Sequence, residues 1–320
     1  MVEPTADVIH TDALIIGAGP IGLFQAFQLG LLEISSHIVD TLPHPGGQCV
    51  ALYGDKPIYD IPGTPVTTGR ALVASLLQQV APFQPTMHLG EQVTTLARQD
   101  DGLLRLGSTA GKTFVARTVF IAAGVGAFVP RRLTLADAEH FEGTRLFYHP
   151  ESLTGFADQA VVVNGGDDTA LSTAIALSRN ACQVTLVHRR DGFQADPALV
   201  AEMRDLVATG RLAFVVGQPT GLDTTHVHVG LPDESTQSIP ADALVACLGI
   251  SPRLGPIADW GLALQRKQLP VDTEKFQTAE PGIFAVGDIN TYPGKKKLIL
   301  CGFHEATLAA WAATAIVFPG

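Results

Sequence analysis

The sequence predicts an α/β protein in which a strand–helix–strand unit occurs twice. The first unit begins with the apolar run Ala13–Ile16, which is typical of a buried parallel strand, and a helical pattern follows over residues 20–32. The same pattern starts again at Gln159, with an apolar strand over Ala160–Val163 and a helix over Thr169–Arg179. The sequence therefore predicts two Rossmann-like dinucleotide-binding domains, each with a parallel sheet and a small antiparallel meander.

Three glycines follow the first strand with the spacing G-x-G-x-x-G. Gly17 makes the tight turn, Gly19 lets the backbone approach a pyrophosphate, and Gly22 lets the helix pack against the strand. The N-terminus of that helix presents free N–H groups and the positive end of its dipole. A second strand, His37–Val39, ends in Asp40, near the position where an acid binds a ribose hydroxyl. The pattern indicates a dinucleotide site, and a glycine-rich turn without a ligand is the alternative.

The segment between the two units contains a loop, a helix and a meander. Pro and Gly residues predict a loop over Pro43–Gly47, and the amphipathic pattern over Gly69–Val80 predicts a helix. Residues 92–121 are typical of a short antiparallel meander, and the apolar strand Val119–Ala123 ends it.

The second unit differs from the first in the residues that follow its second strand. After the strand Gln183–Val187 comes a charged loop, His188–Asp191, that contains Arg189 and Arg190. Paired arginines suit a 2′-phosphate, because a guanidinium binds phosphate in a bidentate way and is always charged. The first unit therefore suggests FAD or NAD and the second NADP, while a solvated loop is the alternative for the arginines.

The remaining elements complete both units. A second meander is expected after the charged loop, and it ends in the apolar strand Ala243–Leu248. A strand over Gly282–Val286 and a final helix over His304–Val317 follow.

Composition narrows the class of protein. The 320 residues suggest about two domains, and the net charge of −10 argues against nucleic acid as a partner. Residues 1–12 are acidic and lack the apolar core of a signal peptide. The apolar runs have strand length, so no membrane span is expected. The cysteines are too far apart for a C-x-x-C pair or a zinc site, and they fit a reducing compartment. They are Cys49, Cys182, Cys247 and Cys301.

The order of motifs resembles that of flavoprotein reductases with two dinucleotide domains, the FAD-dependent pyridine nucleotide-disulphide reductase superfamily. The motifs are GAGPIG, GGQC, an AAG strand end, HRRD and AVGD. Within that group, residues 46–63, 124–133, 254–262 and 285–307 resemble the thioredoxin-reductase-like ferredoxin/flavodoxin–NADP reductases, and the resemblance covers nearly the whole chain. Thioredoxin reductases carry a cysteine pair where this chain has FYHPESLTGFADQ, so dithiol chemistry is not expected.

The resemblance implies a discontinuous FAD-binding domain, residues 1–130 and 252–320, and an NADP-binding-like domain, residues 131–251. In the FAD-binding domain, the resemblance implies that Gln48 approaches the flavin, that Tyr53 lies beside the isoalloxazine and that Asp288 forms a hydrogen bond with the ribityl chain. A core aromatic is the alternative for Tyr53. The residues implied around FAD are Gly17, Gly19, Gly22, Asp40, Gln48, Tyr53, Val93, Phe128 and Asp288. Those implied around NADP are Gly165, Gly166, Arg189 and Arg190.

The implied activity is electron transfer between NADPH and ferredoxin or flavodoxin through FAD. The cofactor carries this chemistry, so no catalytic acid or base is required. The sequence shows no Ser-His-Asp set and no metal-ligand cluster. By the same resemblance we expect a cytoplasmic homodimer. His304 is a candidate flavin neighbour, with a helix-capping or core histidine as the alternative.

Two features depart from the family pattern. The second glycine motif reads Gly165-Gly166-Asp167, where the family has a third glycine. Asp167 adds bulk and negative charge beside a pyrophosphate, whereas without the ligand it would cap the helix favourably. An alternative function is therefore a flavoprotein of the same fold that has lost NADPH binding, and uses another donor or binds flavin without turnover. In addition, family members usually continue past the last helix, whereas this chain ends at Gly320.

Two basic runs stand out in an otherwise acidic chain. Lys295–Lys297 follow the GDI turn, and Arg131 and Arg132 follow the GAF motif. They are candidates for steering an acidic electron carrier, and a solvated loop is the alternative.

Overall fold

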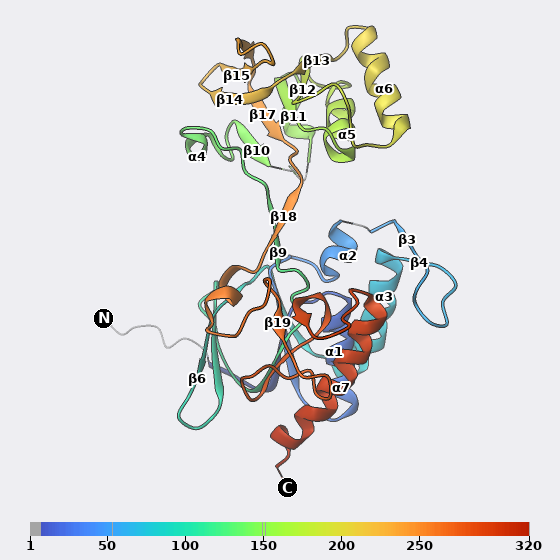
Figure 1. Cartoon of the computed structure of the whole chain (residues 1–320), viewed down its shortest axis with the longest axis vertical. Helices are drawn as coiled ribbons and strands as arrows, with labels where there is room; N and C mark the ends of the chain where they lie inside the picture. Colours follow the sequence, from blue (N-terminus) through green and yellow to red (C-terminus); the bar gives the residue numbers. More distant parts are fainter. Residues whose placement is uncertain (1–7, 53, 149, 151, 320) are drawn as a thin grey trace. The chain divides into compact units, whose positions relative to one another are not determined.

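The computed structural model describes residues 8–52, 54–148, 150 and 152–319, with only the backbone for 127–130 and 250–252. The chain divides into two compact units (Figure 1). Unit 1 contains Met1–Phe128 and Pro252–Gly320, and unit 2 contains Val129–Ser251. The chain passes between them through strands β9 (Ala127–Pro130) and β18 (Ile250–Arg253).

The sheet of unit 1 is parallel at its centre and antiparallel at one edge. Its order is β5-β2-β1-β8-β7-β6, and β20 pairs with the C-terminal half of β8. The strands are β1 (Val8–Ile16), β2 (Ser36–Asp40), β5 (Thr86–Leu89), β6 (Val93–Arg98), β7 (Leu104–Ser108), β8 (Thr113–Ile121) and β20 (Ile283–Ala285). Short strands pair outside this sheet: β3 (Pro57–Ile58) with β4 (Thr67–Thr68), and β19 (Leu269–Pro270) with β21 (Asn290–Thr291).

Three helices cover one face of this sheet, with α1 between α3 and α7 (Figure 1). The helices of unit 1 are α1 (Pro20–Leu31), α2 (Gly47–Ala51), α3 (Gly69–Val80) and α7 (Ile299–Val317). Ala13 and Ile15 of β1 pack toward the helices, whereas Leu14 and Ile16 pack on the opposite face with the meander. Because side chains alternate along a strand, the continuous apolar run of β1 is what burial on both faces requires.

Unit 2 repeats the same plan. Its parallel sheet has the order β10-β17-β11-β12-β13, so β13-β12-β11-β17 corresponds to β5-β2-β1-β8. The strands are β10 (Leu146–Tyr148), β11 (Ala160–Asn164), β12 (Gln183–His188), β13 (Ala213–Val216) and β17 (Ala243–Ala246). The meander is β14 (Gln218–Leu222), β15 (His226–Gly230) and β16 (Thr236–Pro240), and the helices are α4 (Ala138–Phe141), α5 (Asp168–Leu177) and α6 (Pro197–Ala208). The predicted fold class is confirmed.

Two elements differ from the sequence prediction. Helix α6 lies where a meander was expected to begin, and the meander follows it. The signal for α6 was present, because Asp196 caps the helix by accepting from the N–H of Ala198 (2.8 Å), and Pro197 occupies the first turn. Helix α7 begins at Ile299, five residues before His304.

Helix α7 is longer and more apolar than the sequence prediction allowed. It has 19 residues, and an 18-residue window of it has a mean hydropathy of 1.3, so by length and composition alone it could cross a membrane. The prediction counted uninterrupted apolar runs, and polar residues such as Thr307 interrupt this one. A third of its apolar window is buried in the structure. It packs along α1, where Phe303 meets Phe24 with ring centroids 4.6 Å apart.

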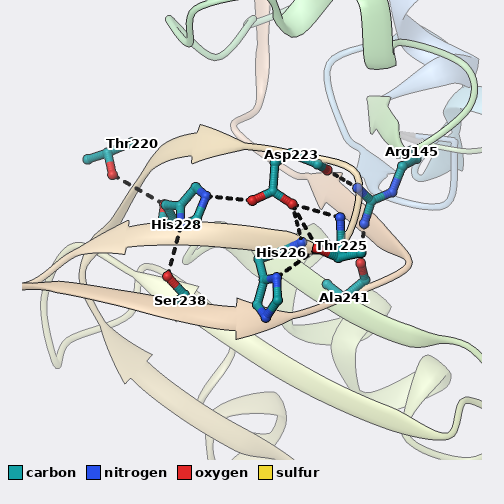
Figure 2. A network of polar contacts seen from close by, with 8 residues as sticks. All are labelled: Arg145, Thr220, Asp223, Thr225, His226, His228, Ser238 and Ala241. Atoms are coloured by element: carbon teal, nitrogen blue, oxygen red, sulfur yellow. Dashed lines mark hydrogen bonds and ion pairs between the residues drawn. The ribbon is translucent and has the colours of Figure 1, made fainter.

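A polar network fixes the meander of unit 2 (Figure 2). The carboxylate of Asp223 accepts from the N–H groups of Thr225 (2.7 Å) and His226 (2.8 Å) and lies 2.9 Å from the ring of His228. The two backbone N–H groups hold the pKa of Asp223 well below its ordinary value. Arg145, just before β10, donates to the carbonyl oxygen of Asp223. The network therefore ties the β14–β15 turn to the parallel sheet.

Candidate functional site

A cavity of about 580 Å³ lies in unit 1 at the carboxyl ends of β1, β2, β8 and β20. Residues at those ends line it, among them Ile16, Asp40, Ala122 and Val286. Strand order reverses between β1 and β8, and ligands of open α/β sheets bind at such a switch point. The position of the cavity is therefore that of a dinucleotide site.

The structure brings most of the residues expected around FAD to this cavity. Gly22 lies in α1 behind the lining and packs against the strand. Tyr53 lies outside the described residues, and Phe128 is on β9, where no side chain is described. The expected residues in the lining are Gly17, Gly19, Asp40, Gln48, Val93 and Asp288.

The three glycines have different surroundings. A Cβ on Gly17, which has φ +112°, would lie 2.5 Å from the carbonyl oxygen of Ala122, and one on Gly22 would lie 1.8 Å from that of Gly17. Those two positions exclude any side chain. Around a Cβ on Gly19 there is nothing within 4 Å. Gly19 thus borders open space at the start of α1, as the approach of a pyrophosphate requires.

The N-terminus of α1 has no side-chain cap. Gly19 is its N-cap residue and offers no side-chain acceptor, and Pro20 follows it. The first N–H groups of a helix need partners outside the helix. Here those groups and the positive end of the helix dipole are left for an anion in the cavity.

Asp40 connects the glycine loop to the second strand. Its carboxylate accepts from the N–H groups of Ala18 (2.5 Å) and Leu42 (2.7 Å), and the residue is 9% exposed. Burial raises the pKa of Asp40 above its ordinary value, and the two hydrogen bonds oppose that rise. A carboxylate has about four acceptor positions, so capacity remains for a ribose hydroxyl.

Further side chains complete the lining. Burial, and secondarily the charge of Asp288, raise the pKa of the Cys49 thiol, so it is protonated at neutral pH. Trp260, which sequence reasoning did not single out, donates from its indole nitrogen to the carbonyl oxygen of Thr94 (3.1 Å). Its only signal was its position inside the stretch 254–262.

The residues of this cavity fit an FAD-type dinucleotide. The open space at Gly19, the uncapped start of α1 and the acid at the end of β2 are three separate features that one ligand would satisfy.

A second cavity, of about 510 Å³, lies in unit 2 at the corresponding place. The residues predicted for NADP line it, and so do Arg131 and Arg132. Arg189 and Arg190 are exposed, and among the described residues neither has a carboxylate within ion-pair distance. Arg132 is ion-paired with Glu142.

Two side chains of unit 2 lie against its own glycine loop. Asp167 is the N-cap of α5, and its carboxylate accepts from the N–H of Ala170 (3.0 Å), as predicted. The ring of His188 lies so close to Gly166 that a Cβ there would be 2.3 Å from it. The same ring stacks on Phe193 with centroids 5.5 Å apart. The sequence pattern does not predict this cover, because it places His188 in the charged loop, whereas His188 is the last residue of β12.

Two other expectations change, those for Lys295 and His304. Lys295 is not available to a partner, because its ammonium group is buried in an ion pair with Glu305. Lys296 and Lys297 are exposed. His304 lies on an exposed part of α7, beside Phe276 at 6.1 Å between ring centroids, and is not among the residues that line the cavity. Among the described residues no His, Cys, Asp and Glu group could hold a metal ion.

Comparison with known proteins identifies the family of this chain and several of its relatives. The family model described as pyridine nucleotide-disulphide oxidoreductase matches residues 11–311. A ferredoxin–NADP reductase of Albidiferax ferrireducens is 54% identical, over 98% of this chain and 91% of its own length. The corresponding protein of Acidovorax sp. (strain JS42) is 57% identical, over 94% and 88%.

Two solved structures share the fold. A bacillithiol disulfide reductase of Staphylococcus aureus aligns with a TM-score of 0.69 at 17% identity, over 96% of this chain and 99% of that one. A thioredoxin reductase of Lactococcus lactis aligns with a TM-score of 0.64 at 21% identity, over 97% and 100%. The predicted resemblance is thus confirmed, and the chain is an oxidoreductase. By its match over most of its length and by its close relatives, this chain belongs to the pyridine nucleotide-disulphide oxidoreductase family.

Proposed function

We propose that this FAD-dependent oxidoreductase passes electrons between NADPH and ferredoxin or flavodoxin. The observation that carries the proposal is the uncapped N-terminus of α1, which borders a cavity lined by Asp40, Gln48 and Asp288. The names of the close relatives, ferredoxin–NADP reductases, support the choice of donor and acceptor.

The residues of unit 1 would hold FAD by complementary means. The first N–H groups of α1 bind the pyrophosphate, the carboxylate of Asp40 accepts from a ribose hydroxyl, and Asp288 does the same for the ribityl chain. The apolar lining, with Val93 and Ile257, excludes water. Bound FAD supplies a centre that exchanges two electrons with NADPH and single electrons with a carrier protein.

The residues of unit 2 both attract and repel NADPH. Arg189 and Arg190 line the cavity and suit the 2′-phosphate. Asp167 opposes the pyrophosphate, because two like charges about 4 Å apart repel by on the order of 4 kcal/mol at an effective dielectric of ~20. That energy corresponds to about a thousandfold in affinity before screening and relaxation. We therefore expect NADPH to bind weakly.

Asp167 also favours a second candidate function, a flavoprotein of the same fold with a different electron donor. The carboxylate already accepts from one of the N–H groups at the start of α5, where a pyrophosphate would bind. Anaerobic mixing with NADPH, followed by flavin absorbance, separates the two candidates. Bleaching by NADPH supports the first, whereas no bleaching at millimolar NADPH supports the second. Photoreduced protein mixed with oxidised ferredoxin then tests whether the carrier accepts electrons.

An acidic carrier protein suits the exposed pair Lys296 and Lys297 of unit 1, and Lys297 also lines the cavity. Electron transfer to ferredoxin should slow as salt is added, because screening weakens charge steering. Rates that are independent of ionic strength would remove this part of the proposal. We further infer a homodimer in the cytoplasm, from the family resemblance and four free cysteines. Light scattering of the purified protein tests the dimer.

A further inference from the structure

A buried ion pair lies behind the turn that carries Asp288. The carboxylate of Glu305, on α7, is fully buried, and the side chain of Lys295 is 7% exposed. The ammonium group of Lys295 lies 2.5 Å from one oxygen of Glu305. The same ammonium group lies 5.3 Å from the centre of the Tyr292 ring, within reach of a cation–π contact.

This pair holds both backbone polar groups of a single residue in the cavity wall, Gly287. The second oxygen of Glu305 accepts from the N–H of Gly287 (2.7 Å), while Lys295 donates to the carbonyl oxygen of Gly287 (2.9 Å). Gly287 lines the cavity with φ +80°, in the left-handed region that favours glycine. Asp288 is the next residue. The pair therefore fixes the backbone from which the side chain of Asp288 enters the cavity.

Two further side chains satisfy the remaining capacity of Glu305. The side-chain amide of Asn290 donates to one oxygen (2.9 Å) and the hydroxyl of Tyr292 to the other (2.9 Å). Burial and the charge of Glu305 raise the pKa of Tyr292, which keeps this hydroxyl as a donor. Glu305 thus accepts four hydrogen bonds, which is the full capacity of a carboxylate.

A buried ion pair is weak evidence for stability, because desolvation of both charges offsets their attraction. Its better attested use is to specify one geometry. Here the two opposite charges cancel. If either partner were removed, the remaining charge would lie uncompensated against the backbone of Gly287, in the wall of the cavity.

We propose that Lys295 and Glu305 are positioning residues that hold the Gly287–Asp288 wall in place and keep its surroundings neutral, and so set the affinity and the reduction potential of bound FAD. This inference rests on the proposed function. It assigns to Lys295 a role inside the protein, in contrast to the exposed Lys296 and Lys297.

The test uses two substitutions with opposite effects on charge, Glu305→Gln and Lys295→Met, in the full-length holoprotein. We expect the FAD dissociation constant to rise roughly tenfold in both, the scale on which supporting side chains around a bound group act. The midpoint potential should rise in Glu305→Gln, where a positive charge stays and favours reduced flavin, and fall in Lys295→Met. Lys275→Met, an exposed lysine of unit 1, is the matched control and should leave both quantities unchanged.

Several outcomes decide the inference. Opposite potential shifts support it, whereas shifts in the same direction, or native affinity and potential in both variants, overturn it. Should either variant not fold, Tyr292→Phe keeps both charges and removes one hydrogen bond from Glu305. It should weaken FAD binding and leave the potential unchanged, and native affinity in this variant would contradict the inference. If the native protein itself binds no FAD, the proposed function fails instead.

Discussion

Gly19 and Asp167 occupy the same place in the two units of this protein. Each is the N-cap of the helix after the first strand, and each has extended backbone, with φ −69° and ψ 179° for Gly19 and φ −110° and ψ −179° for Asp167. In unit 1 the start of the helix is left for a ligand. In unit 2 the carboxylate of Asp167 occupies it, and the ring of His188 covers the neighbouring glycine. The side chains of Asp167 and His188 thus distinguish the self-capped site of unit 2 from the open anion site of unit 1.

The largest expected effect comes from copying unit 2 into unit 1 with Gly19→Asp. The backbone already suits aspartate, and a Cβ meets nothing within 4 Å, so the variant should fold. We expect FAD affinity to fall by about a thousandfold through charge repulsion. Loss of flavin during gel filtration and a titration with FAD measure it. Gly19→Ser, which can cap without charge, should lose much less. A Gly19→Asp protein that keeps its flavin would break the comparison.

The reciprocal change, Asp167→Gly, should raise NADPH affinity by up to about a thousandfold for the same reason. Loss of the cap should destabilise α5 by only on the order of a few tenths of a kcal/mol, since glycine is a tolerable N-cap. Calorimetric titration with NADP⁺ measures the affinity. Asp167→Asn keeps the size of the side chain and removes its charge, so it separates the effect of charge on NADPH affinity from the effect of bulk. Equal affinity in native and Asp167→Gly protein would show that the carboxylate does not control the site.

A smaller effect is expected from Arg189→Ala and Arg190→Ala made in the Asp167→Gly background. Each removes charge-assisted hydrogen bonds, worth about 1.5–3 kcal/mol. We expect preference for NADPH over NADH to fall by roughly tenfold to a hundredfold per arginine. Arg211→Ala, an exposed arginine of unit 2, is the control. An unchanged preference would mean that the arginines belong to a solvated loop.

The smallest effect concerns pH. Burial, and then the charges of Arg189 and Arg190, hold the pKa of His188 below its ordinary value. The unfolded chain therefore takes up this proton first, so the stabilisation is present above about pH 6.5 and is lost as pH falls below it. Thermal unfolding between pH 7.5 and 5.5 should show a smaller loss of stability in His188→Gln than in the native protein. Identical losses would contradict a lowered pKa of the half-buried His188.

Local patterns in the sequence were enough to predict the repeated strand–helix–strand unit, the first glycine loop and the cap at Asp167. Each depends on residues that are close in the chain, as helix caps and strand periodicity do. The Lys295–Glu305 pair and the cover of Gly166 by His188 could not be predicted in the same way. The ion pair joins a turn to helix α7, and the His188 ring at the end of β12 lies against the glycine loop. Tertiary packing, and not local sequence, brings these residues together. Lys295 looked like its exposed neighbours until the fold placed Glu305 beside it.

The central claim is that Asp167 limits the donor site while the site at Gly19 holds the flavin. Anaerobic titration of the holoprotein with NADPH, followed by flavin absorbance, tests it most directly when native and Asp167→Gly proteins are compared. We expect the native flavin to stay oxidised at micromolar NADPH and the Asp167→Gly flavin to bleach. Prompt bleaching of the native flavin at micromolar NADPH would contradict the account.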